Sequence, residues 1–153
     1  MPFFDLKTEF ETVVAKLTPE TKPLWGMMTA QHMLEHILLV INAGIGKFPV
    51  SIYTPEDKIP RSKAFLMSEK PMPREFKAPN LPQEETMPLR FPDFETAKEK
   101  LRQGIANFYA YYENNPEAIH PHPVFGMCNF EEWDMMQRKH FTHHFTQFGL
   151  LEA

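Results

Sequence analysis

Near the end of the sequence the chain reads Lys139-His140-Phe141-Thr142-His143-His144-Phe145-Thr146-Gln147-Phe148-Gly149. His140 and His144 are spaced so that, in a helix, their imidazoles project from the same face. With about 100° of rotation per residue, His143 falls off the centre of that face. The same face carries the aromatic residues Phe130, Trp133, Phe141 and Phe148. Two histidines amid aromatic side chains indicate either a metal held inside a helical bundle or two core histidines bonded to backbone or water.

The composition indicates a single packed domain spanning residues 1–153. Hydrophobic residues make up 42% of the chain and aromatic residues 13%, which is typical of a globular core. The net charge of −4 predicts no nucleic-acid partner, and without a basic run or a long apolar segment we expect no membrane contact. No secretory signal is recognisable, and the single cysteine, Cys128, cannot form an internal disulfide, so we expect a cytoplasmic protein.

Four amphipathic helices are predicted from apolar residues that recur at helical spacing. Thr29, Asp93 and Asn129 are suitable N-caps for the second, third and fourth helices. Asn129 and Glu132 also have the spacing of a capping box, and Gly149 is a suitable stop for the last helix. The predicted helices cover about 3–17, 30–45, 94–113 and 130–148.

A long proline-rich insert, from about 48 to 92, separates the second and third predicted helices. It holds nine of the 15 prolines, a density that forbids a long helix. Val50-Ser51-Ile52-Tyr53 could form a short strand, and Phe65-Leu66-Met67 is apolar enough to dock on a helical core. The insert is either a loop draped over the open end of a bundle or a plain crossover between two helices.

The second predicted helix offers a third histidine for the pair near the end of the chain. His36 lies at the edge of its apolar face, one turn from Met33 and Val40. His32 lies further toward the polar side and in the first turn. His36 is therefore the better inward-pointing candidate, and His32 is a candidate for the rim, although periodicity alone also fits two ordinary histidines.

Two motifs resemble the DinB/YfiT-like superfamily. One is Trp25-Gly26-Met27-Met28-Thr29-Ala30-Gln31-His32-Met33-Leu34-Glu35-His36, which looks like the segment entering the second helix of that family, with a metal ligand at the His36 position. The other is His140-x-x-x-His144 followed three residues later by Gln147. Together with His122-Pro123-Val124-Phe125-Gly126 and Glu132-Trp133, they look most like a subgroup described as DinB-like domains of unknown function. The proline-rich insert departs from the compact typical member.

The resemblance implies an all-α four-helix bundle with a divalent metal bound by His36, His140 and His144. Relatives include thiol-dependent transferases and an isomerase that use low-molecular-weight thiols, and others are described as metal-dependent hydrolases. Imidazole ligands suit zinc, nickel, copper or iron, and we expect zinc or nickel first. The resemblance also implies homodimers, for which an aromatic run on the third helix could supply the interface. That run is Phe108, Tyr109, Tyr111 and Tyr112.

Several other residues could assist such a site. Gln147 could orient a ligand or a metal-bound water, or could simply pack between helices. His120 and His122 precede the last helix and could supply a fourth ligand or a general base, although histidines beside prolines are more often structural. We expect Glu35 to be a solvated carboxylate and Cys128 to be an inert buried thiol.

Two classes of function fit these residues. The first is a metal-dependent enzyme acting on a small-molecule substrate, either a transferase with a low-molecular-weight thiol cosubstrate or a hydrolase. The second is a non-catalytic metal-binding or stress-response protein whose site is structural or vestigial. Three intact histidines favour the enzyme, whereas the motifs contain no obvious general acid or base, which favours the second class.

Overall fold

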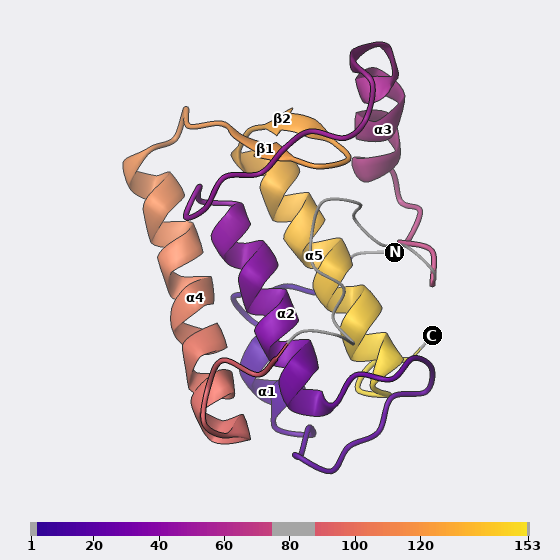
Figure 1. The fold of residues 1–153 in the computed structure, drawn as a ribbon, viewed down its shortest axis with the longest axis vertical. Coiled ribbons are helices and arrows are strands. Elements are labelled where there is room, and N and C mark those ends of the chain that lie inside the picture. Colours follow the sequence, from indigo (N-terminus) through magenta and orange to yellow (C-terminus); the bar gives the residue numbers. More distant parts are fainter. Residues whose placement is uncertain (1–2, 75–87, 153) are drawn as a thin grey trace.

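The computed structural model describes residues 3–74 and 88–152, and within these ranges the chain is mostly helical (Figure 1). In chain order the helices and strands are α1 (Phe10–Val14), α2 (Ala30–Ala43), η1 (Glu56–Lys58), α3 (Ile59–Leu66), α4 (Phe94–Asn114), β1 (His120–His122), β2 (Gly126–Cys128) and α5 (Phe130–Gln147), where η1 is a short 3₁₀ helix. Within the described ranges no helix has the length and hydropathy needed to cross a bilayer.

The three long helices begin at the predicted caps. The side chain of Thr29 accepts a hydrogen bond from the backbone N–H of His32, and that of Asp93 accepts one from Thr96. Asn129 and Glu132 form the predicted capping box at the start of α5. Capping satisfies backbone donors that have no partner inside the helix, so these short motifs fix where α2, α4 and α5 start.

The end of α5 is fixed by Gly149. This glycine has a φ of +73°, in the left-handed backbone region that residues other than glycine rarely adopt. The backbone N–H of Leu150 donates to the carbonyl of Phe145, and that of Gly149 donates to Thr146, which is the Schellman pattern. The predicted stop is therefore confirmed.

Helix α2 lies between α4 and α5 and contacts both, with α1 behind α2 in the view of Figure 1. The aromatic rings of Phe10 in α1 and Phe141 in α5 meet edge to face with their centroids 6.4 Å apart. The shared core is apolar and draws on all four of these helices. Its members include Phe10, Val13, Ile37, Ile41, Leu101, Phe108, Phe141 and Phe145.

The first helix is much shorter than predicted, because only Phe10–Val14 is α-helical. Before it, the side chain of Asp5 accepts hydrogen bonds from the backbone N–H groups of Lys7 and Thr8, which holds this segment in turns. The apolar face predicted from periodicity is nevertheless buried, so the correction concerns backbone conformation and not packing. Leu6, Phe10, Val13 and Leu17 all lie in the core.

The insert is partly helical in the described residues. η1 and α3 occupy its middle, and α3 packs near the start of α5 beside the two strands (Figure 1). Residues 50–53 do not form the suggested strand, although the backbone N–H of Tyr53 donates to the carbonyl of Pro123. Leu66 is fully buried, as its apolar surroundings in the sequence suggested. The part of the insert from 75 to 87 lies outside the described residues.

A small antiparallel hairpin precedes α5, and the sequence analysis did not predict it. β1 pairs with β2 so that His120 lies opposite Cys128 and His122 opposite Gly126. The indole N–H of Trp133 donates to the carbonyl of His120, which fixes the hairpin to the first turn of α5. Two strands of three residues give too little alternation to be recognised from periodicity.

The aromatic run on α4 is largely used inside the chain. Phe108 and Tyr112 are buried. The hydroxyl of Tyr109 donates to the carboxylate of Asp134, and that of Tyr111 is hydrogen-bonded to His120. These contacts account for the aromatic residues without a second subunit, and the homodimer stays a prediction.

Docking of the insert can be tested at Leu66. Leu66→Ala removes a fully buried side chain and should lower the free energy of unfolding by about 2–5 kcal/mol. The neighbouring Met67 is 45% exposed, so Met67→Ala should change the free energy of unfolding by less than about 0.5 kcal/mol. Denaturant unfolding of both variants measures the difference. Equal, small effects would mean that α3 is not part of the cooperative core.

Candidate metal centre

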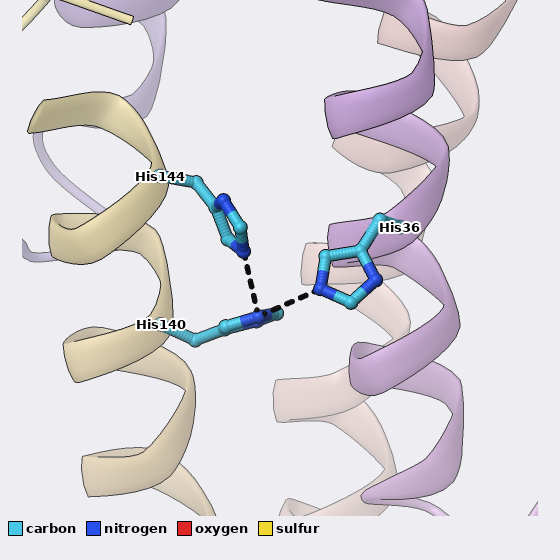
Figure 2. A group of neighbouring side chains, drawn as sticks. All are labelled: His36, His140 and His144. Carbon is cyan, nitrogen blue, oxygen red and sulfur yellow. Dashed lines mark hydrogen bonds between the residues drawn. The ribbon is translucent and has the colours of Figure 1, made fainter. Parts of the chain in front are cut away.

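Three imidazoles from two helices converge on one point in the core (Figure 2). The Nε2 atom of His140 lies 3.0 Å from Nε2 of His36 and 3.1 Å from Nε2 of His144. One ligand atom from each of the three rings lies within 4.8 Å of the others. The predicted meeting of His36 with the pair on the last helix is confirmed. Elsewhere in the described part of the chain, no three His, Cys, Asp or Glu side chains gather in this way.

The local sequence explains this convergence. His140 and His144 are one turn apart on α5, and both are buried at 5% and 4% exposure. His36 comes from the neighbouring helix α2, whose start is fixed by the Thr29 cap. Because each helix has its rotation fixed by its buried apolar face, the three side chains can meet only where those faces touch.

Gln147 sets the orientation of His144. Its amide N–H donates to the carbonyl of Trp25 over 3.0 Å, so its amide oxygen must face the other way. That oxygen lies 2.7 Å from Nδ1 of His144 and can only accept a hydrogen bond. His144 therefore carries its proton on Nδ1 and presents a lone pair at Nε2, toward the other two rings. Of the two roles considered for Gln147, this geometry favours orienting a ligand.

The environment keeps these imidazoles neutral. Burial, and after it the proximity of His143, lower the pKa of His36 to about 4. Burial, followed by the proximity of the other histidines, lowers the pKa of His140 and of His144 well below the usual value near 6.5. Neutral imidazole is the form of histidine that binds metals.

Three neutral imidazole rings cannot satisfy one another's hydrogen-bonding groups at Nε2. His144 has only a lone pair at Nε2, so it needs a donor, and the Nε2 proton of His140 can serve it. His140 then has no lone pair left at Nε2 for His36, and one of the two close contacts stays unsatisfied. A cation between three lone pairs removes this conflict. Nitrogens about 2.0–2.1 Å from a tetrahedral zinc ion are about 3.3 Å apart, close to the two distances of 3.0 and 3.1 Å from Nε2 of His140 to the other two rings.

The remaining histidines lie outside this cluster. His143 packs against Trp25 with ring centroids 5.8 Å apart, off the inward face as predicted from helical phase. Nδ1 of His32 lies 2.7 Å from the hydroxyl of Thr29, at the start of α2. His120 is hydrogen-bonded to Tyr111 through Nε2.

His122 is buried at 1% exposure but is not a member of the triad. Its Nδ1 accepts hydrogen bonds from the backbone N–H groups of Val124 at 3.0 Å and Phe125 at 3.3 Å. A neutral imidazole that accepts at Nδ1 carries its proton at Nε2. His122 therefore presents a donor to the core, so it does not supply the fourth ligand that the sequence left open.

Glu35 is not the solvated carboxylate that the sequence analysis expected. Its side chain is only 5% exposed. Its two oxygens accept hydrogen bonds from the backbone N–H groups of Arg90 and Phe91 and from the amide of Gln31. The tertiary structure brings the end of the insert back onto α2, and this could not be read from helical phase alone. Glu35 thus ties down the chain and does not serve as a base beside the triad.

Cys128 is buried, as predicted. Burial raises the pKa of its thiol to about 12, so almost no thiolate forms near neutral pH. The thiol itself donates weakly to backbone carbonyls of the hairpin, at Phe125 and Gly126. It is a packing residue of the core.

Gln137 was missed in the sequence analysis. It is fully buried on α5, and its amide N–H donates to the carbonyl of Val40 on α2 over 3.1 Å. It lies one turn before His140, on the face that continues to His144 and Gln147. The signal was present, because a polar residue at helical spacing within an aromatic and histidine face is unlikely to point to solvent.

Comparisons of the chain with protein-family models, with curated proteins and with solved structures found no match. The function is therefore inferred from the residues of the site.

Acid should destabilise the metal-free protein. His122 has its pKa lowered by burial to about 3 and His36 to about 4, whereas in the unfolded chain each is near 6.5. Between these values the unfolded state binds more protons, so the free energy of unfolding falls as the pH falls below about 6.5. The expected slope is about 1.4 kcal/mol per pH unit for each such histidine.

Urea unfolding at several pH values between 7 and 5 measures this slope. His122→Phe removes one titrating group and should reduce the slope by about one proton per molecule. If the free energy of unfolding did not change over this range, these histidines would have to be either protonated in the folded protein or exposed.

Proposed function

We propose that this chain binds one divalent metal ion through His36, His140 and His144 and acts as a metal-dependent enzyme on a small molecule. The observation that supports it most directly is the convergence of three neutral Nε2 atoms whose lone pairs cannot be satisfied by one another. Zinc or nickel is the first choice, since three imidazoles suit either ion. A bound ion of this kind would polarise a substrate oxygen or lower the pKa of a coordinated water or thiol.

The donor set supports an open coordination position. Structural zinc sites are closed by four protein ligands, whereas catalytic sites have three and leave one for water or substrate. The best candidate for a fourth protein ligand, His122, has its lone pair occupied by two backbone N–H groups. His36 is only partly buried, which is compatible with access from that side.

The triad, with Gln147 behind His144, also supports the finer family proposal. On that proposal the helices form a four-helix bundle of the DinB/YfiT-like type carrying a proline-rich insert. A thiol-dependent transferase or a hydrolase would then be the expected reaction, in a cytoplasmic homodimer. A low-molecular-weight thiol would serve as cosubstrate in the first case.

A specific observation favours the alternative, a non-catalytic metal-binding or stress-response protein. The only group of candidate ligands in the described residues consists of histidines, and no carboxylate joins it. Glu35, which is adjacent to His36 in the sequence, is held by the backbone of Arg90 and Phe91. A hydrolase would then need its general base from the substrate, from a thiol or from one of the other histidines.

Metal content is the first test. The purified protein should bind one zinc or nickel ion per chain, and His144→Ala should lose most of it because one of three ligands is gone. His143→Ala is the matched control and should retain the metal, since its ring packs on Trp25 and on the edge of His144 but is not one of the three converging ligands. Elemental analysis gives the metal content, and circular dichroism checks that helical content is kept.

Two outcomes would count against the proposal. If metal content followed His143 and not His144, the assignment of the inward face would be wrong. If the wild-type protein bound no first-row divalent ion near neutral pH, the enzyme would be excluded, and the alternative, a protein whose site is vestigial, would take its place.

The enzyme and the structural alternative differ at the open position. A cobalt-substituted protein with an open position should show a new absorption band when a small thiol such as 2-mercaptoethanol is added. A closed site should show no spectral change at the same thiol concentration. Screens of the metal-loaded protein for thiol-transfer and hydrolase activity then test which reaction it catalyses.

The role of Gln147 can be tested separately. Gln147→Leu removes the acceptor that fixes the Nδ1 proton of His144, and zinc affinity should fall about 10–100-fold. Gln103→Leu, at an exposed position on α4, should leave the affinity unchanged. Competition with a chromophoric chelator measures the zinc affinity of both variants. Equal affinities would show that the hydrogen bond does not support the ligand.

A further inference from the structure

Four buried side-chain polar atoms have no hydrogen-bond partner among the described residues. They are Nδ1 of His36, Nε2 of His122, Oε1 of Gln137 and Nδ1 of His140. A buried polar group without a partner costs about 1–3 kcal/mol, and buried water commonly satisfies such groups. All four atoms belong to the triad or to side chains of the same core region. This concentration is not expected from chance burial in an otherwise apolar core.

Three of these atoms have a defined hydrogen-bonding character. Nε2 of His122 is a donor, because Nδ1 accepts from two backbone N–H groups. Oε1 of Gln137 is an acceptor, because its amide N–H is used by the carbonyl of Val40. Nδ1 of His140 is a donor whenever Nε2 offers its lone pair to a metal. Two donors and one acceptor match the needs of a water molecule, which can accept twice and donate.

Packing places these side chains in one region. Gln137 and His140 are three residues apart on one face of α5, so they are neighbours. The ring of His122 lies 5.3 Å, centroid to centroid, from that of Trp133. A Cβ atom at Gly44 would lie 3.0 Å from both the Gln137 amide nitrogen and the Trp133 ring, so both side chains border Gly44.

We propose that ordered water in the core between α2, α5 and β1 joins His122 and His140 to the amide oxygen of Gln137. The water accepts the Nε2 proton of His122, donates to Oε1 of Gln137 and contacts Nδ1 of His140. This gives His140 the support that Gln147 gives His144, through water in one case and directly in the other. Gln137 and His122 are then positioning residues, and their role toward the metal rests on the proposed function above.

The water itself can be tested without metal. In the metal-free wild-type protein, the imidazole Nε2 proton of His122 should appear as a slowly exchanging nuclear magnetic resonance with a cross-relaxation peak to water. Gln137→Met keeps the approximate volume but removes the acceptor, and should weaken or remove that peak. Gln103→Met on the exposed face of α4 is the matched control and should leave it unchanged. A His122 proton without any water contact in the wild-type protein would overturn the proposal.

The positioning role is tested in the zinc form. Here the Nδ1 proton of His140 should also show a water contact, and Gln137→Met should lower zinc affinity about 10–100-fold. His122→Phe should produce a smaller loss, because the water would still join Gln137 to His140. If Gln137→Met kept both the His140 water contact and the zinc affinity, Gln137 would not be a positioning residue.

The two proposals fail in different ways. A wild-type protein that shows the His122 water contact but binds no first-row divalent ion would refute the metal-dependent function and leave the water site standing. A protein that binds zinc through the triad without water at His122 or His140 would support the metal site and refute the water.

Discussion

The burial of three neutral imidazoles between α2 and α5 is the constraint on which the rest of the core depends. Neutral histidine needs one donor and one acceptor partner, and a core of phenylalanine and leucine offers neither. Several of the buried polar residues are therefore found near the histidines. Gln147 binds His144 directly, and Gln137 and His122 present polar atoms in the same region.

The two glutamines beside the histidines also join these two helices. Gln147 also donates to the carbonyl of Trp25, which holds the segment before α2 against the end of α5. Gln137 donates to the carbonyl of Val40, which ties the middle of α5 to the last turns of α2. Each glutamine thus uses one end of its amide to join the helices and leaves its oxygen for a histidine or for water. A side chain that can only donate or only accept could not do both.

The insert is part of the fold and not merely a crossover. Leu66 is buried, the ammonium group of Lys139 donates to the carbonyl of Phe65, and Lys63 forms an ion pair with Glu132. At its other end, Glu35 accepts two backbone N–H groups where the chain returns to the core. The carboxylate nearest to His36 in the sequence therefore supports the fold, which leaves the three histidines as a purely imidazole site.

The sequence alone determined the three long helices and the three inward histidines, because caps and helical phase are local properties. Thr29, Asp93, Asn129 and Gly149 mark the ends, and the spacing of His140 and His144 fixes a common face. Only the tertiary structure decided the features that depend on long-range contacts or on backbone turns. Asp5 turns the first segment away from a long helix, the end of the insert buries Glu35, and the hairpin directs the Nε2 proton of His122 into the core. These outcomes depend on partners distant in sequence or on backbone turns, which periodicity does not encode.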